Sequence, residues 1–240
     1  MASEKHEESL YWLKPDDEER VRPNNQHRLL IHVIENKILQ APIDPSTITR
    51  IVDVGTGTGI WLDALATYLD PIPVATGQRR QYTGLDMSPA NFPASHPENF
   101  HYSIYNILHP VPEELKEKYD LVHVRLLVSA LSKGDANRAV GNLAQLLRPG
   151  GWTQWDELDG DSWAGRVPSP HVREINELVR QYMETKGMEL NRSAKMILQE
   201  NGKPNVEEEV QRLEKGAKAD IERDGIFWDS DEHVLLAQKK

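Results

Sequence analysis

Hydrophobic positions alternate along the chain between helical and strand-like spacing. From Gln26, Leu30, Ile34 and Ile38 recur every four residues, which predicts an amphipathic helix that ends before Pro42. The β-branched run at 48–54 predicts a strand that leads directly into a glycine-rich turn. A second helix is predicted after this turn by four apolar residues on one face: Leu62, Leu65, Ala66 and Leu69.

The same alternation continues to about residue 157. Further strands are predicted at 81–86, 100–106, 119–124 and 152–157. Asp135 can cap a helix that turns Val140, Leu143 and Leu147 inward and stops at Pro149. Strands that alternate with helices indicate an α/β fold, with a mostly parallel sheet and helices on both faces.

The two ends of the chain are less regular. Residues 1–25 are polar and acidic, and are either a frayed terminus or an arm that folds Tyr11 and Trp12 over a pocket. Beyond Leu158 the pattern weakens, with helical spacing at 170–200 and a highly charged segment at 205–223. Only Val234–Ala237 resembles a closing strand, so we expect an atypical C-terminal part.

Composition and charge narrow the classes of partner. Lys and Arg total 28 against 38 Asp and Glu, a net charge of −10, which argues against nucleic acid or an anionic membrane as partner. The sequence has no Cys, no apolar signal segment at its start and no apolar run near the roughly 20 residues that a membrane helix needs. We expect a cytoplasmic protein, and nothing in the sequence argues against the nucleus.

The turn after the first predicted strand carries the most chemical information. Its sequence, Asp53-Val-Gly55-Thr-Gly57-Thr-Gly59, places glycine at every second position between a strand and a helix. Glycine lets a ligand approach the main chain, and the helix N-terminus offers unpaired N–H groups. A dinucleotide fingerprint would need glycine where Ile60 stands, and no Lys follows as in a phosphate-binding loop.

This D-x-G-x-G-x-G spacing resembles the glycine loop of class I S-adenosylmethionine-dependent methyltransferases. Asp86 ends the next predicted strand, where a carboxylate can bind both ribose hydroxyls. The resemblance extends over residues 48–157 through Tyr119–Arg125 and the Leu147–Trp152 turn. These motifs are most similar to those of fungal secondary-metabolism methyltransferases.

The resemblance implies a Rossmann-like class I methyltransferase fold, S-adenosyl-L-methionine as cofactor and a small-molecule acceptor. The residues that it assigns to the cofactor are Asp53, Gly55, Thr56, Gly57, Gly59, Asp86, Met87, Asn106 and Arg125. Asn106 stands where the family often has an Asp that contacts the adenine amine. The resemblance also implies one domain over 26–240, with a cofactor half at 48–157, an acceptor or lid part at 158–232 and a closing strand at 233–240.

The candidate catalytic residues follow the fourth and fifth predicted strands. They are His123 and Glu157, with a hydrogen-bonded histidine in a buried strand and a solvated strand end as the respective alternatives. Arg28 could reach the cofactor carboxylate from the first helix, or lie at the surface. The nine His residues show no metal-binding spacing such as H-E-x-x-H, and we expect no metal.

The favoured hypothesis is methyl transfer to oxygen or nitrogen of a small metabolite. The alternative is a protein with the same fold that does not transfer methyl groups and acts as a regulatory partner or a different catalyst. A nicotinamide-dependent oxidoreductase ranks last because of Ile60. The weak C-terminal pattern leaves open a homodimer or a protein partner that completes the acceptor side.

Overall fold

The structure is a computed structural model that describes residues 17–127, 130–131, 135–158, 170, 174, 177, 212, 215 and 232–240. A six-stranded sheet with the order β3-β2-β1-β4-β5-β6 organises these residues. The strands are β1 (Arg50–Val54), β2 (Gln81–Asp86), β3 (Phe100–Ile104), β4 (Tyr119–Arg125), β5 (Leu147–Leu158) and β6 (Glu232–Gln238). The pairs β1–β2, β1–β4 and β2–β3 are parallel, so the predicted mostly parallel α/β fold is confirmed.

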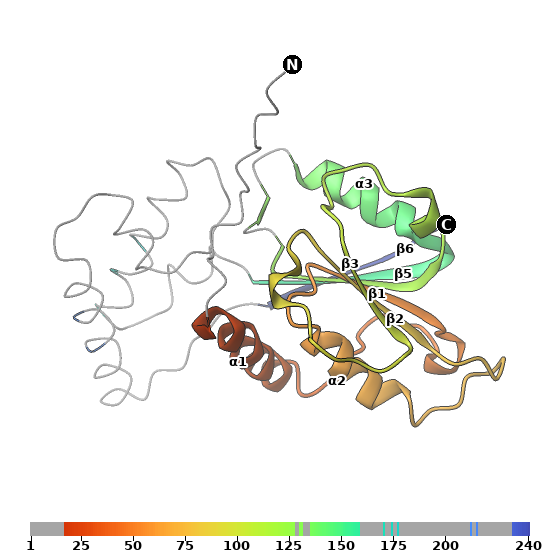
Figure 1. Cartoon of the computed structure of the whole chain (residues 1–240), viewed down its shortest axis with the longest axis horizontal. Helices are drawn as coiled ribbons and strands as arrows, with labels where there is room; N and C mark the ends of the chain where they lie inside the picture. The colour runs from red at the N-terminus through yellow and green to blue at the C-terminus, as the bar shows by residue number, and fades with distance from the viewer. Residues whose placement is uncertain are drawn as a thin grey trace, which may run out of the picture. The chain divides into compact units, whose positions relative to one another are not determined.

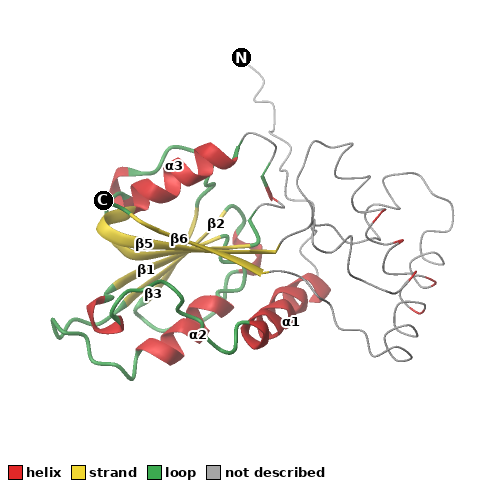
Figure 2. Cartoon of the chain, turned by 180° about the vertical axis from the view of Figure 1, so that it is seen from behind, coloured by secondary structure: helices red, strands yellow, loops and turns green. Residues whose placement is uncertain are grey.

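Helices cover both faces of this sheet. Helices α1 (Asp17–Val33) and α2 (Ile60–Leu69) lie on one face, and α3 (Ala136–Leu146) lies on the other, as Figures 1 and 2 show from opposite sides. Three short 3₁₀ turns occur in the connections: η1 (Pro45–Thr47), η2 (Pro89–Asn91) and η3 (Glu113–Leu115). The two-sided cover explains why the central strands are apolar on both faces.

The core beneath α2 holds the glycine turn in place. Leu62, Leu65 and Leu69 of this helix are fully buried. They belong to one apolar cluster with residues of β1, β2 and β4, among them Ile51, Tyr82 and Leu121. Burial of each such side chain contributes roughly 1.5–3 kcal/mol. The helix that leaves the glycine turn is therefore fixed against the strand that enters it.

The first helix differs from its prediction at both ends. It begins at Asp17, inside the segment that was expected to be a flexible arm, and ends at Val33. Glu35 and Asn36 follow with φ of 52° and 63°, a left-handed conformation that ends a helix. Ile38 is buried although it lies beyond the helix. Tyr11 and Trp12 lie outside the described residues.

The helix after Asp135 is confirmed, and Leu143 and Leu147 are buried as predicted, but the prediction for Val140 is wrong. Val140 is 53% exposed, whereas Ala139, Leu143 and Leu146 are buried. These three residues have the i, i+4, i+7 spacing of one helical face. Leu147 already belongs to β5, which starts five residues before the predicted strand at 152–157.

The expected closing strand is present as β6, and the chain end beyond it pairs with β5. Lys239 exchanges backbone hydrogen bonds with Gly150 and Gly151, at 2.8 and 2.9 Å. The described positions at 174, 177, 212 and 215 are helical, and the rest of the predicted helical segments lies outside the described residues. Among the described helices, none has the length and apolar character to cross a membrane.

The chain forms two compact units. The first comprises Met1–Arg125, Ala139–Gln154 and Leu236–Lys240, and the second comprises Leu126–Arg138 and Trp155–Leu235. The glycine turn and the strands β1 to β4 all belong to the first unit. The division into an arm, a cofactor half and an acceptor part stays a prediction.

A buried carboxylate joins the amino ends of three strands. Asp120, with a 4% exposed side chain, accepts hydrogen bonds from the backbone N–H groups of Thr49 and Arg50 at 2.7 and 2.8 Å. It also accepts from the Thr49 hydroxyl and forms an ion pair with Arg148. Burial by itself would raise the pKa of Asp120, but the bonds from Arg148 and the backbone lower it.

Replacement of this carboxylate should therefore destabilise the sheet. In Asp120→Asn one oxygen becomes an NH₂ group that faces donors, and we expect a loss of about 2–4 kcal/mol in the free energy of unfolding. Urea denaturation measures this loss. Glu113→Gln, at an exposed ion pair with Lys116, should cost under about 0.5 kcal/mol. Equal effects of the two changes would contradict the role of Asp120.

Candidate functional site

The glycine turn is tied to the second strand by main-chain hydrogen bonds. The N–H groups of Gly55 and Thr56 both donate to the Leu85 carbonyl, at 2.8 and 3.1 Å. The Gly57 N–H donates to Asp86 Oδ2 at 2.9 Å. The structure thus brings together the loop and the acid at the end of β2, two features that are 29 residues apart in the sequence.

The glycines of this turn serve different physical purposes. Gly57 has φ of 53°, and a Cβ at this position would meet nothing within 4 Å. Its backbone is thus open to close approach from outside. Gly59 has φ of 76° and precedes α2, and a Cβ there would overlap the Tyr102 ring and hydroxyl. Gly57 therefore leaves room for a ligand, whereas Gly59 leaves room for packing.

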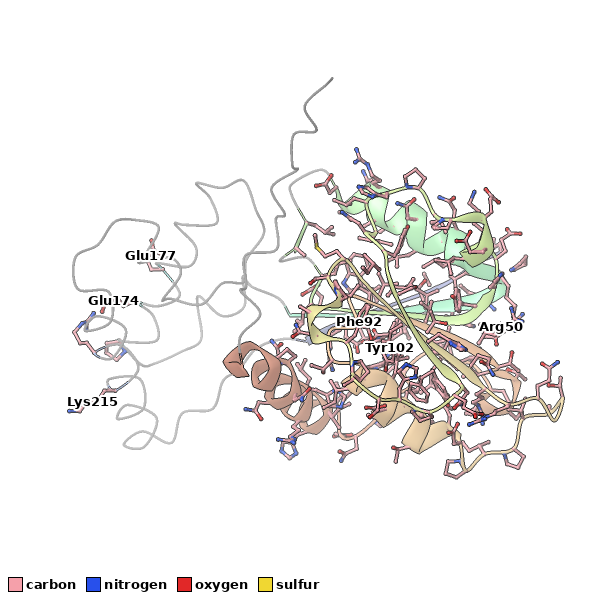
Figure 3. The ribbon with its side chains drawn as sticks, viewed as in Figure 1. Arg50, Phe92, Tyr102, Glu174, Glu177 and Lys215 are labelled. Atoms are coloured by element: carbon pink, nitrogen blue, oxygen red, sulfur yellow. The ribbon has the colours of Figure 1, made fainter. Side chains whose placement is uncertain are left out.

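Tyr102 is a residue of this site that the sequence analysis missed. In β3 it pairs in register with Gly84, and its ring occupies the space that side chains at Gly84 and Gly59 would fill. Phe92 lies beside it, with ring centroids 5.5 Å apart (Figure 3). Burial, followed by the negative charges of Asp63 and Asp53, raises the pKa of the Tyr102 phenol. A glycine at the centre of a strand was the signal that could have predicted a bulky neighbour.

Asp86 combines burial with several backbone donors. Besides Gly57, it accepts a hydrogen bond from the Ser88 N–H at 3.1 Å, and it is 8% exposed. Burial raises its pKa, while the hydrogen bonds from Gly57, Ser88 and Met87 lower it and the charge of Asp53 raises it. A buried carboxylate of this kind gains from further donors, such as a pair of hydroxyl groups.

Two side-chain oxygens near these residues in sequence are buried without a partner. They are Thr56 Oγ1, in the glycine turn, and Asn91 Oδ1, in the η2 turn that follows Asp86. Buried polar atoms are normally hydrogen-bonded, so these two can form hydrogen bonds with a polar ligand. The residues present therefore fit a polar ligand with hydroxyl groups, held by backbone approach at Gly57 and by the Asp86 carboxylate.

The other predicted cofactor residues have more specific local roles. Asn106 Oδ1 accepts from the Leu108 N–H at 2.9 Å, which forms a turn at the carboxyl end of β3. Met87 is half-buried between Asp86 and Ser88. Asp53 is buried beneath the turn, and its Oδ1 lies 2.7 Å from His123 Nδ1 on the neighbouring strand β4.

His123 lies deep inside the sheet layer. Its side chain is 0% exposed and stacks on Trp61, with ring centroids 3.5 Å apart and an interplanar angle of 2°. In this position the ring orients the start of α2 against β1 and β4 and presents no surface to an acceptor. This arrangement matches the alternative of a hydrogen-bonded histidine in a buried strand, and a direct catalytic role for His123 stays a prediction.

Glu157, the second catalytic candidate, lies near the end of β5 in the second unit. It is half-buried, and its Oε2 accepts a hydrogen bond from the Trp155 indole N–H at 3.1 Å. A carboxylate has about four acceptor sites, so a single hydrogen bond does not use its whole capacity to accept. Its catalytic role also stays a prediction.

Helix α1 contacts the site through His27 rather than Arg28. Arg28 is exposed and donates to Asn25 at 3.2 Å. His27, one residue earlier, is 6% exposed, and its Nδ1 lies 2.9 Å from Nη1 of Arg125 at the end of β4. His27 precedes Leu30 and Ile34 on the predicted apolar face, so the helical spacing already indicated that His27 would be buried.

The electrostatic surroundings of His27 keep its imidazole neutral. Burial comes first and the positive charge of Arg125 second among the causes that lower its pKa to about 4. The charges of His123 and Arg28 lower it further, and that of Asp53 raises it.

Among the described residues no group of three or more His, Asp or Glu side chains is placed to hold a metal ion.

With this geometry in view, comparison with known proteins gives the class. A family model described as "Methyltransferase domain" matches residues 21–206, and the chain belongs to this family. It is an S-adenosyl-L-methionine-dependent methyltransferase with a Rossmann-like class I fold, as its sheet order and glycine turn also indicate. The alternative of a protein that keeps the fold without the activity is not supported.

Individual relatives are fungal enzymes. The chain is 67% identical over 285 aligned positions to methyltransferase grgD of a Penicillium species, with 100% of both chains covered. It is 31% identical to N-methyltransferase gliN of Aspergillus fumigatus, over 88% of this chain and 73% of that protein. N-methyltransferase sirN of Leptosphaeria maculans is 38% identical over 68% of this chain and 56% of its own length.

The packing of Tyr102 generates a test that does not need a ligand. In Gly84→Ala the new Cβ would overlap the Tyr102 ring and lie 2.9 Å from Thr56 Cγ2. We expect a loss of about 1–3 kcal/mol in the free energy of unfolding, and Gly84→Ala should cost much less in a Tyr102→Leu background. The control is Gly141→Ala in α3, where a Cβ meets nothing within 4 Å. This substitution should raise the free energy of unfolding by roughly 0.5–1 kcal/mol. Additive effects at positions 84 and 102 would contradict the overlap.

The buried neutral His27 also predicts a pH dependence. Its pKa of about 4 in the folded chain lies below the ordinary 6.5, so the unfolded chain binds a proton that the folded chain does not. Stability should therefore fall as pH is lowered from about 6.5 toward 4. His27→Asn should reduce this fall, measured as the Tm at a series of pH values. Parallel pH curves for the two proteins would show that His27 does not titrate in this way.

Proposed function

We propose that the protein transfers a methyl group to an oxygen or nitrogen atom of a small-molecule acceptor in secondary metabolism. The observation that carries the proposal is the glycine turn hydrogen-bonded to Asp86, with an open approach at Gly57. The fungal relatives support the metabolic context, and two of them are named N-methyltransferases, which favours nitrogen over oxygen.

The cofactor supplies an activated methyl group on a sulfonium. A lone pair on the acceptor forms the new bond to the methyl carbon while the carbon–sulfur bond breaks and its electrons stay on sulfur. The acceptor's proton, where it has one, leaves to a carboxylate or to water. Such a reaction depends mainly on holding the two reactants in line and near contact, about 3 Å apart.

This chain's own residues would bind and orient rather than react. Asp86 would accept from the ribose hydroxyls, and the open backbone at Gly57 would allow close approach. Arg125 would face the amino-acid end, and Asn106 the adenine. Glu157 is the candidate for receiving a proton. We further propose a cytoplasmic location, with neither nucleic acid nor a membrane as partner, in keeping with the net charge of −10.

Calorimetric titration with S-adenosylhomocysteine and, separately, with NADH tests the site. We expect binding of the former alone. Asp86→Asn should raise the Kd for S-adenosylhomocysteine by about 10- to 100-fold, because one charged acceptor of a hydroxyl is lost. Asp44→Asn is the control and should leave the Kd unchanged, because Asp44 is an exposed η1 cap before the amino end of β1, whereas the glycine turn follows the carboxyl end of that strand.

Methyl transfer itself is tested with labelled S-adenosylmethionine and a panel of small acceptors that differ in the atom offered. Label in amine or amide products would support nitrogen, and label only in phenols or alcohols would support oxygen. Label on carbon alone would contradict the proposed acceptor class. An unchanged Kd in Asp86→Asn would remove that residue from the site.

A further inference from the structure

Two polar side chains on one face of α1 contact the machinery around the glycine turn. Asn24 Oδ1 accepts a hydrogen bond from the Thr58 hydroxyl at 2.7 Å. One helical turn later, His27 lies 2.9 Å from Arg125. Residues three apart in a helix share a face, so the same side of α1 reaches both the glycine turn and the carboxyl end of β4.

The direction of the second hydrogen bond follows from the chemistry of the two groups. A guanidinium only donates, so His27 Nδ1 must accept and the ring proton lies on Nε2. A neutral imidazole orients the guanidinium without cancelling its charge. The pair therefore keeps a net positive charge, held in one orientation by a ring that is 6% exposed.

The sheet places this cation on the opposite side of the turn from Asp86. Val54 of β1 pairs with Val124 of β4, so the next residues, Gly55 and Arg125, follow side by side at the same edge. Asp86 ends β2, on the other side of β1. A ligand that spans the turn thus meets a carboxylate toward β2 and a guanidinium toward β4.

The polar groups of the cofactor follow the same order along the molecule as the residues that would bind them. Its ribose hydroxyls, which suit a carboxylate, are separated by the sulfur from an α-carboxylate, which suits a guanidinium. We propose that His27 is a positioning residue that holds Arg125 toward the α-carboxylate of the cofactor, and that α1 closes this end of the site through His27 and Asn24. This inference rests on the proposed cofactor site.

The test compares two ligands that differ in the amino-acid group. S-adenosylhomocysteine has the α-carboxylate, whereas 5′-methylthioadenosine keeps the adenine, ribose and sulfur and lacks the amino acid. In His27→Leu, which removes the acceptor, we expect the Kd of the first to rise about tenfold and that of the second to stay within about twofold. His27→Asn keeps an acceptor at the Nδ1 position and should retain most of the affinity for both.

Controls separate positioning from general damage. His32→Leu changes an exposed histidine of the same helix and should leave both affinities unchanged. If His27→Leu does not fold, His27→Gln moves the acceptor to the Nε2 position and should show the same selective loss. Equal weakening of both ligands, or no change for S-adenosylhomocysteine, would overturn the inference. If the unmodified protein binds neither ligand, the proposed cofactor site itself fails.

Discussion

The hydrogen bond from the Gly57 N–H to Asp86 joins the two parts of the chain that form the candidate cofactor site. It requires a backbone that turns sharply after β1, a strand β2 parallel to β1, and a carboxylate at the end of that strand. The Leu85 carbonyl, which receives the N–H groups of Gly55 and Thr56, holds the same turn from its other end. Much of the surrounding structure keeps these few atoms in place.

The two layers around the turn provide that support. On one side, α2 buries its leucines against β1 and β4, and Trp61 stacks on His123, which in turn is bonded to Asp53. In β3, Tyr102 fills the space left by glycines of β2 and of the turn. At the opposite edge of the sheet, Asp120 joins the amino ends of β1, β4 and β5. Asp53, His123 and Asp120 are buried and hydrogen-bonded, which favours one strand register over its alternatives.

The comparison with grgD also shows a difference in length. Its alignment of 285 positions is 45 longer than the 240 residues of this chain, so the relative has segments with no counterpart here.

The sequence by itself determined the order of strands and helices, the glycine turn and the acid at the end of β2. These features depend on local spacing, which neighbouring residues decide. Tertiary structure decided that His27 rather than Arg28 faces the site, that Ala139 rather than Val140 is buried, and that Tyr102 covers Gly84. The physical reason is that a helix of 3.6 residues per turn can rotate by one residue with little change in its apolar pattern. Only packing against the sheet fixes that rotation. Only the order of the strands decides which side chains become neighbours across the sheet.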